Sequence, residues 1–572
     1  MKRVLLFLLA VTILTSCSFG GRTIKLVNGK EEYKIVVPQE ALPVETLAAS
    51  ELQRYIEQIS GVEIAIVNDS VTASGVEISV GNTNRVDESQ AGRNTLGKDG
   101  FNIYTEDGTL YIVGGTGRGV LYGVYSFLEK YLGCRRYAPD AEYIPDTAVI
   151  EIPALISERQ VPAFAYRSLV CDSTADQVFI DQWKLSCCGD CEEGIQWDTL
   201  NGMTSVSMYP NLQLLGLDVQ QYMKGQNEAL FVQNNLTGEF GPLRAYLYAK
   251  LMWNPLTDVD SLITDFTNGY YGKGGVYVKQ YIDSSRTDFE KAAAALDTKA
   301  LSIQYWDSSN YLSRENVRAY ENIFDQAEVA VADDSKLARR VKIARLPVTY
   351  AYLEQAKERP ADDGGAFIEE CGLRKSSPGY MRKAQNFAIL SNAIGVKEIA
   401  DNHTTPDEYL DMTMQFVDHS FVRDKSYRKP VTVLSGADYV GQGNESALTD
   451  GYYGSFQNRV GWLGFPATQF EVIVDLGEEQ EITSIASHFL NSPAENIYFP
   501  VTVRYLVSKD NINYSKVGEL RRNTQEKAVL AKEYLSDNLK VKGRYVKVQV
   551  SGPNPADIGG RGFTYIDEIT IR

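Results

Sequence analysis

Histidine is scarce in this chain of 572 residues, which holds only His403, His419 and His488. A metal centre built from several imidazoles is therefore not expected. All three histidines follow position 400, which also disfavours a Ser-His-Asp triad in the earlier parts of the chain. Positive charge is in deficit as well, because 57 Lys and Arg stand against 74 Asp and Glu, a net charge of −17. So acidic a chain is not expected to bind nucleic acid, whose phosphates it would repel.

Long apolar runs are also absent, and no stretch approaches the ~18 residues that a transmembrane helix needs. The apolar stretch Val4–Leu14 follows two basic residues and has the length of a signal-peptide core. The Leu-Thr-Ser-Cys that ends at Cys17 resembles a bacterial lipobox. We predict a lipoprotein signal peptide over residues 1–16 and a lipid on Cys17, with an ordinary secretory signal as the alternative. The lipid is then the only expected contact with a membrane, on the periplasmic or surface face of the bacterial cell envelope.

Alternating strands and helices predict an α+β domain over residues 22–155. The stretch Glu45–Ser60 has its apolar residues on one helical stripe and Gly61 behind it, the pattern of an amphipathic helix. Strands are predicted at 33–38, 62–67, 76–80, 101–104 and 109–113. The glycine-rich run 114–119 then opens a second helix that ends near Leu132. Its spacing fits neither a dinucleotide fingerprint nor a P-loop, so it is interpreted as a tight connection, and no organic cofactor is expected.

Two segments of this domain, "LAASELQRYIEQISGVEIAIV" and "GGTGRGVLYGVYSFLEKYLGCRRYAPD", carry a family resemblance. They resemble the small α+β domain that precedes the catalytic barrel in alpha-glucuronidases and beta-hexosaminidases. They also resemble the Bacteroidetes-type proteins that carry a DUF4838 domain. In those enzymes the domain is an accessory to the barrel and supplies no catalytic carboxylate, so the resemblance implies none here.

Residues 156–254 resemble pieces of the DUF4838 region. "PAFAYRSLVCDS" looks like the first barrel strand, and "GEFGPLRAYLYAKLMW" looks like the exit from the barrel. From residue 162 to residue 255 there are only 94 residues, whereas an eightfold βα barrel needs at least ~200. The sequence therefore predicts a truncated, partial βα barrel. Its remaining strands are expected to pair with the flanking domains as a small irregular layer, because their edges would otherwise stay open.

Residues 255–400 are predicted to form a helical domain, since apolar residues follow helical spacing along 317–331 and again along 337–348, where Pro347 is expected to cause a kink. Residues 401–428 have few signals and are interpreted as a linker. From residue 429 the pattern changes to strands of period two separated by turns, typical of an antiparallel sandwich.

This last region, 429–572, resembles the F5/8 type C (discoidin) domain in segments such as "GWLGFPATQFEVIVDLGEEQEITSIASHFLNS" and the final "YIDEITIR". The resemblance implies a jelly-roll sandwich of two sheets that often binds carbohydrate through loops at one end. The predicted fold class is thus multidomain α+β. It comprises an N-terminal α+β accessory domain, a partial βα-barrel remnant, a helical domain and a C-terminal β-sandwich.

Glycoside hydrolysis requires two carboxylates at a fixed separation. Two residues of the barrel-like region are candidate catalytic groups: Asp198, at what looks like the end of a strand, and Glu239, where the chain leaves the barrel. The stronger interpretation is that each is an ordinary loop or helix-cap acid, and that the catalytic residues of the family lay in the missing segment.

The discoidin resemblance implies one structural calcium ion near the "LTDG" loop and the last strand. Asp450 and Glu568 are then its carboxylate ligands, with backbone carbonyl groups of residues 447–450 completing a set of oxygens that suits calcium. The alternative is that Asp450 makes only a turn hydrogen bond and Glu568 only a salt bridge.

Sugar binding needs an aromatic face and a few planar polar groups. The candidates lie in turn-rich stretches of the sandwich: Trp462, Phe465, Tyr452, Tyr453 and Asn491. Trp462 is the strongest of them, and a position in the sandwich core is its alternative.

These features predict a lipid-anchored glycan-binding protein of the cell envelope, related to polysaccharide-degrading glycoside hydrolases but without a complete catalytic barrel. The first alternative is an active alpha-glucuronidase-like hydrolase that acts on polysaccharide. The second is an envelope adhesion protein that binds a protein partner.

Overall fold

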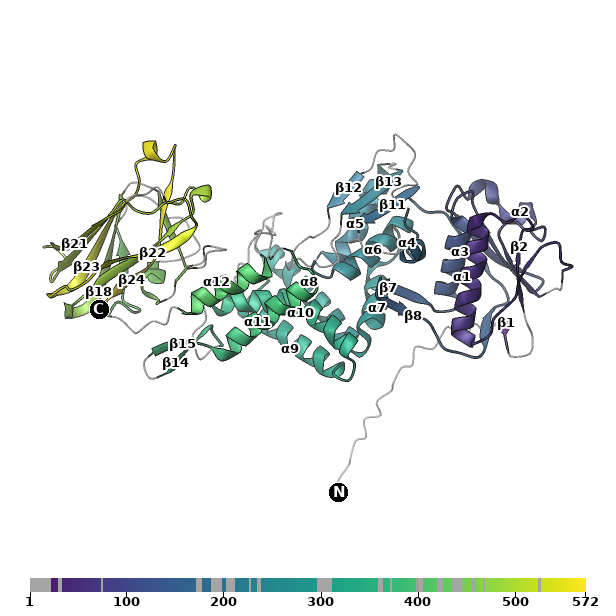
Figure 1. Ribbon diagram of the computed structural model, residues 1–572, viewed down its shortest axis with the longest axis horizontal. Helices are drawn as coiled ribbons and strands as arrows, with labels where there is room; N and C mark the ends of the chain where they lie inside the picture. Colours follow the sequence, from purple (N-terminus) through teal and green to yellow (C-terminus); the bar gives the residue numbers. More distant parts are fainter. Residues whose placement is uncertain are drawn as a thin grey trace, which may run out of the picture. The chain divides into compact units, whose positions relative to one another are not determined.

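The computed structural model describes residues 22–28, 33–73, 76–170, 177–186, 198–201, 211–225, 228–233, 238–295, 311–357, 364–370, 373–397, 399, 405–418, 425–434, 445–451, 453–454, 459, 461–466, 469–522 and 526–572. It divides into two compact units, one ending at Val348 and the other beginning at Thr349 (Figure 1). In the described segments no helix is long and apolar enough to cross a membrane. Cys17, the predicted site of lipidation, lies outside them.

A six-stranded mixed sheet forms the centre of the N-terminal domain, in the order β10-β5-β6-β4-β2-β3. Its strands are β2 (Lys34–Val37), β3 (Ile66–Asn68), β4 (Glu77–Val80), β5 (Phe101–Glu106), β6 (Thr109–Gly114) and β10 (Ser157–Gln160). Helices α1 (Pro43–Ser60) and α3 (Gly119–Lys130) lie side by side on the sheet and join it in one apolar core (Figure 1). The amphipathic helix and its stop at Gly61, where φ is +72°, are confirmed. The strand predicted at 62–67 is shorter and begins only at Ile66.

Smaller elements surround this sheet. They are β1 (Thr23–Val27) paired with β9 (Ile150–Pro153), the short helix α2 (Glu88–Ala91), and the hairpin of β7 (Arg135–Ala138) and β8 (Ala141–Tyr143).

The glycine-rich connection between β6 and α3 is a tight turn, as predicted, and it packs against the loop of residues 97–100. A Cβ atom on Gly115 would come within 2.0 Å of the Gly97 carbonyl oxygen, and one on Gly119 within 2.1 Å of the Gly100 carbonyl oxygen. Hydrogen bonds close the contact, because Gly115 N donates to Gly100 O at 2.8 Å. Glycine is required here by the close approach of two backbones. The contact fixes the loop that carries Asp99.

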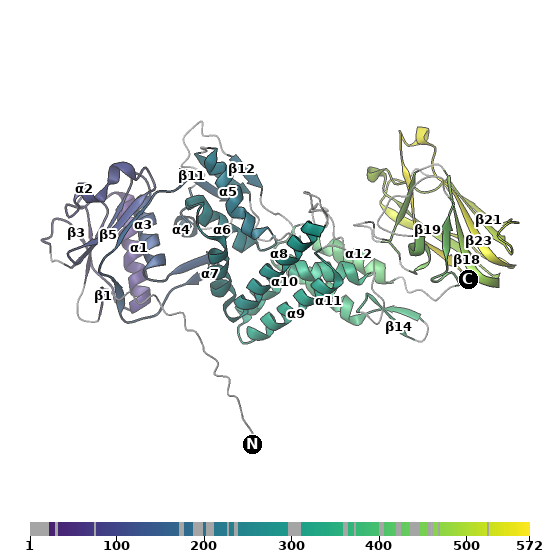
Figure 2. The same ribbon diagram turned by 180° about the vertical axis from the view of Figure 1, so that it is seen from behind.

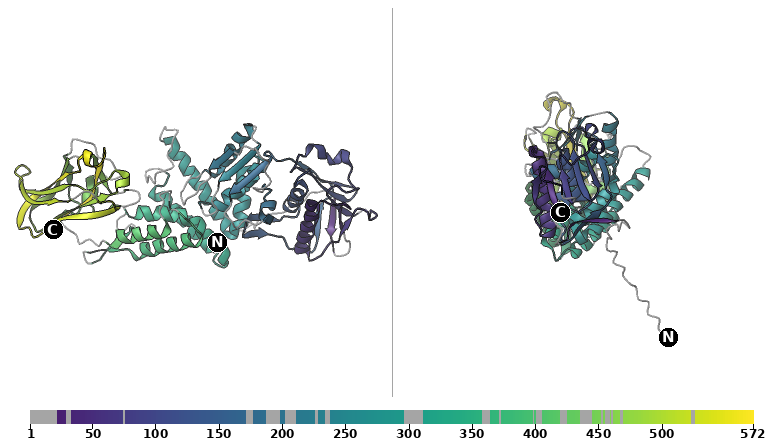
Figure 3. Two further views of the ribbon diagram at one scale, coloured as in Figure 1. Left: turned by 45° about the horizontal axis from the view of Figure 1, so that its top comes forward. Right: turned by 90° about the vertical axis from the view of Figure 1, so that its right-hand side faces the viewer.

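The barrel-like region forms a three-stranded parallel sheet in the order β11-β13-β12 (Figure 3, left). The strands are β11 (Tyr166–Val170), β12 (Asp198–Asn201) and β13 (Ala229–Gln233), and the helices are α4 (Gln177–Gln182), α5 (Leu215–Lys224) and α6 (Gly241–Trp253). The prediction that these strands pair with the flanking domains is wrong. Within the described ranges they pair with one another, which satisfies the backbone of β13 on both sides.

Four helices follow: α7 (Val259–Tyr271), α8 (Gly275–Ala295), α9 (Arg314–Ala330) and α10 (Ser335–Ala356). The apolar stripe predicted for α9 is buried at Val317, Tyr320, Ile323, Phe324 and Ala327. Pro347 lies inside α10, which continues on both sides of it.

Arg167 of β11 ties the three-stranded sheet to the N-terminal domain. Its side chain is fully buried, at 0% exposure, and its guanidinium group donates to Asp99 Oδ2 at 2.7 Å. The same group donates to the carbonyl oxygens of Phe164 and Lys184 at 2.7 and 2.9 Å. It also lies 5.1 Å from the ring centre of Trp253 in α6. A buried charge is stable only with partners of this kind, so this one residue holds a loop, a strand and a helix together.

Trp253 belongs to the core of the N-terminal domain although it ends α6. Its ring stacks on Phe101 at a centroid distance of 5.8 Å, and its Nε1 donates to Gln160 Oε1 at 2.6 Å. Tyr122 of α3 adds another contact, donating from its hydroxyl to Leu185 O at 3.0 Å. The accessory domain and the barrel remnant therefore share a continuous interface within the first unit.

The second unit begins with the last residues of α10. A hairpin and two helices follow: β14 (Phe367–Glu370), β15 (Leu373–Ser376), α11 (Pro378–Ala393) and α12 (Pro406–Asp418) (Figure 2). The interpretation of 401–428 as a linker is wrong over α12. A capping box begins this helix: Thr405 Oγ1 accepts from Glu408 N at 3.3 Å, and Glu408 Oε2 accepts from Thr405 N at 2.8 Å. The Thr-Pro-Asp-Glu of the sequence is thus a helix start.

The C-terminal region is a β-sandwich, as predicted (Figure 2). One antiparallel sheet has the order β16-β18-β23-β20-β21 and the other the order β17-β24-β19-β22. The strands are β16 (Val431–Val433), β17 (Leu463–Pro466), β18 (Gln469–Ile482), β19 (Ile485–Asn491), β20 (Thr502–Ser508), β21 (Ser515–Arg521), β22 (Leu530–Ser536), β23 (Val541–Ser551) and β24 (Phe563–Ile571). Apolar residues from both sheets form a single core between them.

Replacing Arg167 with methionine is expected to lower the free energy of unfolding of the first unit by about 3–5 kcal/mol, because the Asp99 carboxylate and buried carbonyl groups lose their partner. Calorimetry of the full chain measures this change. The transition of the first unit should move to lower temperature, whereas that of the sandwich should stay in place.

Lys25→Met is the matched control. Lys25 pairs with Glu151 at 3.4 Å with both side chains largely exposed, and such surface pairs contribute about 0–1 kcal/mol. Equal destabilisation by the two substitutions would contradict the role given to Arg167.

Candidate functional site

Asp198, one of the two candidate catalytic residues, is the first residue of β12 and pairs with Leu230 near the start of β13. It thus stands at a strand end, as predicted, and that end is the amino end of β12. In parallel sheets covered by helices, catalytic groups and ligands gather at the carboxyl ends of the strands. Asp198 lies at the other edge.

Glu239 lies beyond the carboxyl end of β13, in the turn before α6. Its side chain is only 5% exposed and pairs with buried Arg244, whose Nη2 lies 3.3 Å from Glu239 Oε2. Arg244 Nε also donates to Glu239 O at 3.0 Å. This ion pair holds the turn at the start of α6, so Glu239 has a structural partner already.

The two candidates stand at different levels of the sheet. Three residue steps of β13, about 10 Å, separate the level of Asp198 from the end of the strand that Glu239 follows. Hydrolases hold their two carboxyl groups about 5–10 Å apart across the bond they cut. This offset along the strand is at the upper end of that range.

Three of the predicted sugar contacts, Trp462, Phe465 and Asn491, are buried inside the sandwich at 0–1% exposure. Phe465 stacks on Phe470 with ring centroids 3.9 Å apart. The Asn491 amide donates to Ala528 O at 2.8 Å. A side chain without exposed surface cannot stack on a sugar, so these three residues do not fit that role. The buried alternative holds for Trp462. Tyr452 lies outside the described residues.

Trp462 supports a stack of rings that leads toward the surface. His488 of β19 lies over it, with centroids 5.5 Å apart and planes at 29°, and Tyr453 lies over His488 at 3.9 Å. Exposure increases along the stack, from fully buried Trp462 to half-buried Tyr453. Among the predicted aromatic residues with described positions, Tyr453 is half-buried and the others are buried.

A buried carboxylate that the sequence analysis missed fixes this stack. Asp567 of β24 accepts from His488 Nδ1 at 2.8 Å and from Gly454 N at 2.7 Å. Burial raises the pKa of Asp567, and the two hydrogen bonds oppose that effect. In the sequence Asp567 is visible as an acid inside an apolar strand, but its partner His488 lies 79 positions away.

Asp450 and Glu568, the predicted calcium ligands, lie on adjoining segments. Glu568 is buried, and its Oε2 accepts from the backbone N of Gly451, which follows Asp450, at 3.1 Å. Within the described ranges no group of three or more His, Cys, Asp and Glu side chains is placed to hold a metal ion. Carboxylate and carbonyl oxygens are the donors that calcium takes, so these residues fit such an ion in kind, with backbone groups supplying the rest of the shell.

Comparison with known families gives two matches. Residues 26–127 match the model of the glycosyl hydrolase family 67 N-terminus, and residues 195–283 match that of the domain of unknown function DUF4838. Both bear out the resemblance seen in the sequence, and the chain is thereby related to glycoside hydrolases. No curated protein sequence matches the chain.

Several solved structures are similar at low identity. A family GH115 4-O-methyl-alpha-glucuronidase with specificity for decorated arabinogalactans is 10% identical, with 96% of this chain and 100% of that chain covered and a TM-score of 0.43. The carbohydrate-binding module CpGH89CBM32-6 from Clostridium perfringens is 18% identical, covering 26% of this chain and 98% of that chain with a TM-score of 0.19. The family 32 module of NanJ from C. perfringens, in complex with galactose, is 19% identical, with 26% and 95% covered and a TM-score of 0.19.

Substituting alanine for Gly454 is expected to destabilise the sandwich by about 1–3 kcal/mol. A Cβ atom there would lie 2.2 Å from Trp462 Nε1, and the buried indole has no room to retreat. Thermal unfolding of the full chain measures the loss.

Gly379→Ala in α11 serves as the control, since its new Cβ atom would have Ser377 Oγ at 3.8 Å as its nearest contact. This change should leave stability equal or slightly higher. A sandwich that tolerates alanine at position 454 as well would show that Trp462 is not held as described.

Proposed function

We propose that this protein is a lipid-anchored glycan-binding protein of the bacterial cell envelope, and that it does not hydrolyse the glycan it binds. The relation to glycoside hydrolases supports a polysaccharide as the partner. The sandwich supplies the binding surface in this proposal, and the first unit is inherited from a hydrolase-like ancestor.

The stack of Trp462, His488 and Tyr453 is the observation that carries the proposal. Sugars bind aromatic rings through their C–H groups when a polar group nearby takes their hydroxyls. The His488 ring packs against the Tyr453 ring, and Asp567 accepts a hydrogen bond from His488. A ring fixed in this way loses little conformational entropy when a ligand binds, which favours affinity.

The absence of hydrolysis is proposed on the geometry of the barrel remnant. Asp198 begins its strand, and Glu239 is engaged by Arg244. In this proposal the two do not form the acid and base pair that works across a glycosidic bond.

Calcium is proposed as a structural ion of the same sandwich, held by Asp450, Glu568 and carbonyl groups of the preceding turn. When bound, it would supply positive charge that fixes the loop leading to Tyr453. Its proposed contribution to sugar binding is therefore through positioning.

Alanine in place of Tyr453 is expected to weaken glycan binding by about tenfold or more, because stacking on a sugar is lost. A glycan array identifies the ligand with the mature chain, and titration calorimetry with that ligand measures the change. Chelation by EDTA should lower both affinity and the unfolding temperature of the sandwich.

Tyr514→Ala is the control, because Tyr514 lies in the hairpin between β20 and β21, on the other sheet. If Tyr453→Ala leaves glycan binding unchanged, the stack of Trp462, His488 and Tyr453 is not part of the binding site. Release of reducing sugar from the bound glycan would instead favour the alpha-glucuronidase-like alternative, and failure of the folded chain to bind any glycan would favour a protein partner.

Lipidation rests on the lipobox-like sequence before Cys17. Cys17→Ala should abolish incorporation of labelled palmitate and move the protein from the membrane fraction to the soluble fraction of a bacterial host. Unchanged labelling of this variant would contradict the anchor, and Cys134→Ala, at a cysteine buried within the N-terminal domain, is the control.

A further inference from the structure

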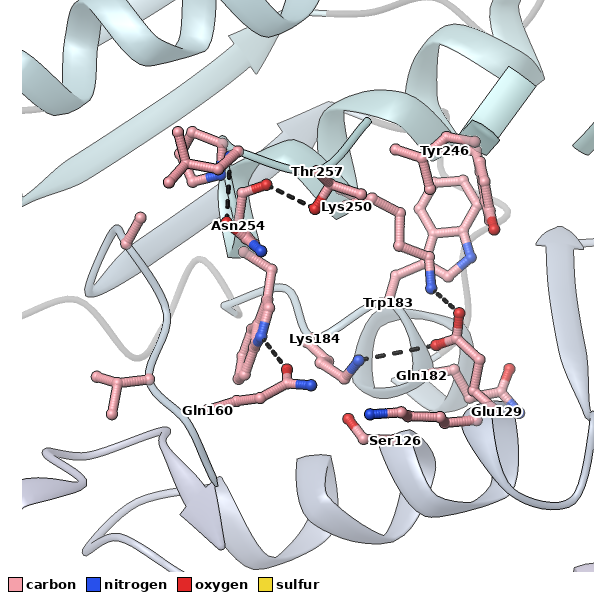
Figure 4. A pocket seen from close by; sticks show the side chains of 18 of the residues that line it. Ser126, Glu129, Gln160, Gln182, Trp183, Lys184, Tyr246, Lys250, Asn254 and Thr257 are labelled. Atoms are coloured by element: carbon pink, nitrogen blue, oxygen red, sulfur yellow. Dashed lines mark hydrogen bonds and ion pairs between the residues drawn. The ribbon is translucent and has the colours of Figure 1, made fainter. Parts of the chain in front are cut away.

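A cavity of about 590 Å³ opens where the accessory domain meets the barrel remnant (Figure 4). Its walls come from α3, β10, the end of α4, α6 and the turn after α6. This volume lies in the range of sites that take small organic molecules, and far exceeds that of a single inorganic ion.

The charge of the cavity is opposite to that of the chain. Five cationic residues line it, Lys130, Arg135, Arg159, Lys184 and Lys250, against the two acids Glu129 and Glu158. The protein as a whole has a net charge of −17. Cations gathered in one recess of an acidic protein create a local field that attracts anions.

Two of these cations share one carboxylate. Figure 4 shows the ammonium groups of Lys184 and Lys250 both pointing to Glu129, and Lys184 Nζ lies 3.8 Å from Glu129 Oε2. Burial raises the pKa of Glu129, but the two lysines outweigh burial and bring it to about 2. The group of three thus has one positive charge in excess.

Other charges of the cavity are balanced nearby. Lys130 Nζ lies 2.7 Å from Glu158 Oε2, and Arg135 Nε lies 3.2 Å from Asp265 Oδ1. The excess positive charge therefore lies at Lys184 and Lys250 and at Arg159, whose Nη2 donates to the neutral Thr95 O at 2.6 Å.

Neutral polar side chains make up much of the remaining wall. They are Ser126, Gln160, Gln182, Asn254 and Thr257. Amides and hydroxyls of this kind donate to and accept from hydroxyl groups. The aromatic residues of the wall are engaged in packing, as Trp253 is by Phe101 and Lys184. The wall suits a hydroxylated ligand more than an apolar one.

We propose that this cavity binds a small hydroxylated carboxylic acid, with its carboxylate on the ammonium groups of Lys184 and Lys250, which it shares with Glu129, and its hydroxyls on the amide-lined wall. A sugar acid and a shorter hydroxy acid share this chemistry. The site belongs to the first unit and uses no residue of the sandwich, so it is independent of the glycan-binding proposal.

Titration calorimetry of the full chain with galacturonate and with galactose tests the site, because the two sugars differ by one carboxylate. Galacturonate is expected to bind in the first unit and galactose is not. Malate is the third probe: tighter binding of galacturonate assigns the ligand to the sugar acids, and tighter binding of malate assigns it to short hydroxy acids. No binding of either acid at millimolar concentration overturns the proposal.

Lys250→Met should weaken binding of the acid by about tenfold or more, since the carboxylate loses one of its two charged donors. Lys25→Met removes the same charge outside the cavity and should leave binding unchanged. Tyr453→Ala should also leave it unchanged, which separates this site from the sandwich. Equal affinity in Lys250→Met and the parent chain overturns the placement of the ligand.

The pH dependence of binding gives a second measurement that needs no substitution. Burial lowers the pKa of Lys184 to about 8, Lys250 and Arg167 act in the same direction, and Glu129 and Glu158 oppose them. Acid binding should therefore weaken as Lys184 loses its proton above about pH 8. Binding that stays constant from pH 7 to pH 9 would falsify the assignment of Lys184 as a ligand contact.

Discussion

The buried guanidinium group of Arg167 is the constraint on which the first unit depends. A charge in an apolar interior costs several kcal/mol unless every donor finds a partner. The loop of residues 97–100 must therefore present Asp99, and the glycine-rich turn must leave room for that loop. Lys184 links this contact to the cavity, because its carbonyl oxygen accepts from Arg167 while its ammonium group faces Glu129.

Local patterns in the sequence predicted much of the fold. The apolar stripe of Glu45–Ser60, the glycine run 114–119 and the alternation of the last 140 or so residues all correspond to observed elements, because each depends on neighbours in the chain. Helix α12 could also have been predicted from the sequence. Its capping box stands in the sequence as Thr405 to Glu408, within a stretch where no other signal drew attention.

The candidate sites depended on contacts between distant residues, and there prediction failed. Trp462 is the strongest predicted sugar contact, but it is fully buried and Gly454 lies directly against its indole. His488 and Asp567 meet only because β19 and β24 are neighbours in one sheet. Asp198 lies at the amino end of its strand, and a run of four residues does not show which end of a strand a residue occupies. The cavity draws its wall from segments spread over residues 126–262.

The position of Trp253 has a consequence for how the chain can be divided. This ring completes the core of the accessory domain, yet it lies 93 positions after Gln160, the last residue of that domain's sheet. The whole sheet therefore precedes in the chain the residue that completes its core. A fragment cut after the last strand of the sheet would lack this ring and would expose an apolar site on the domain.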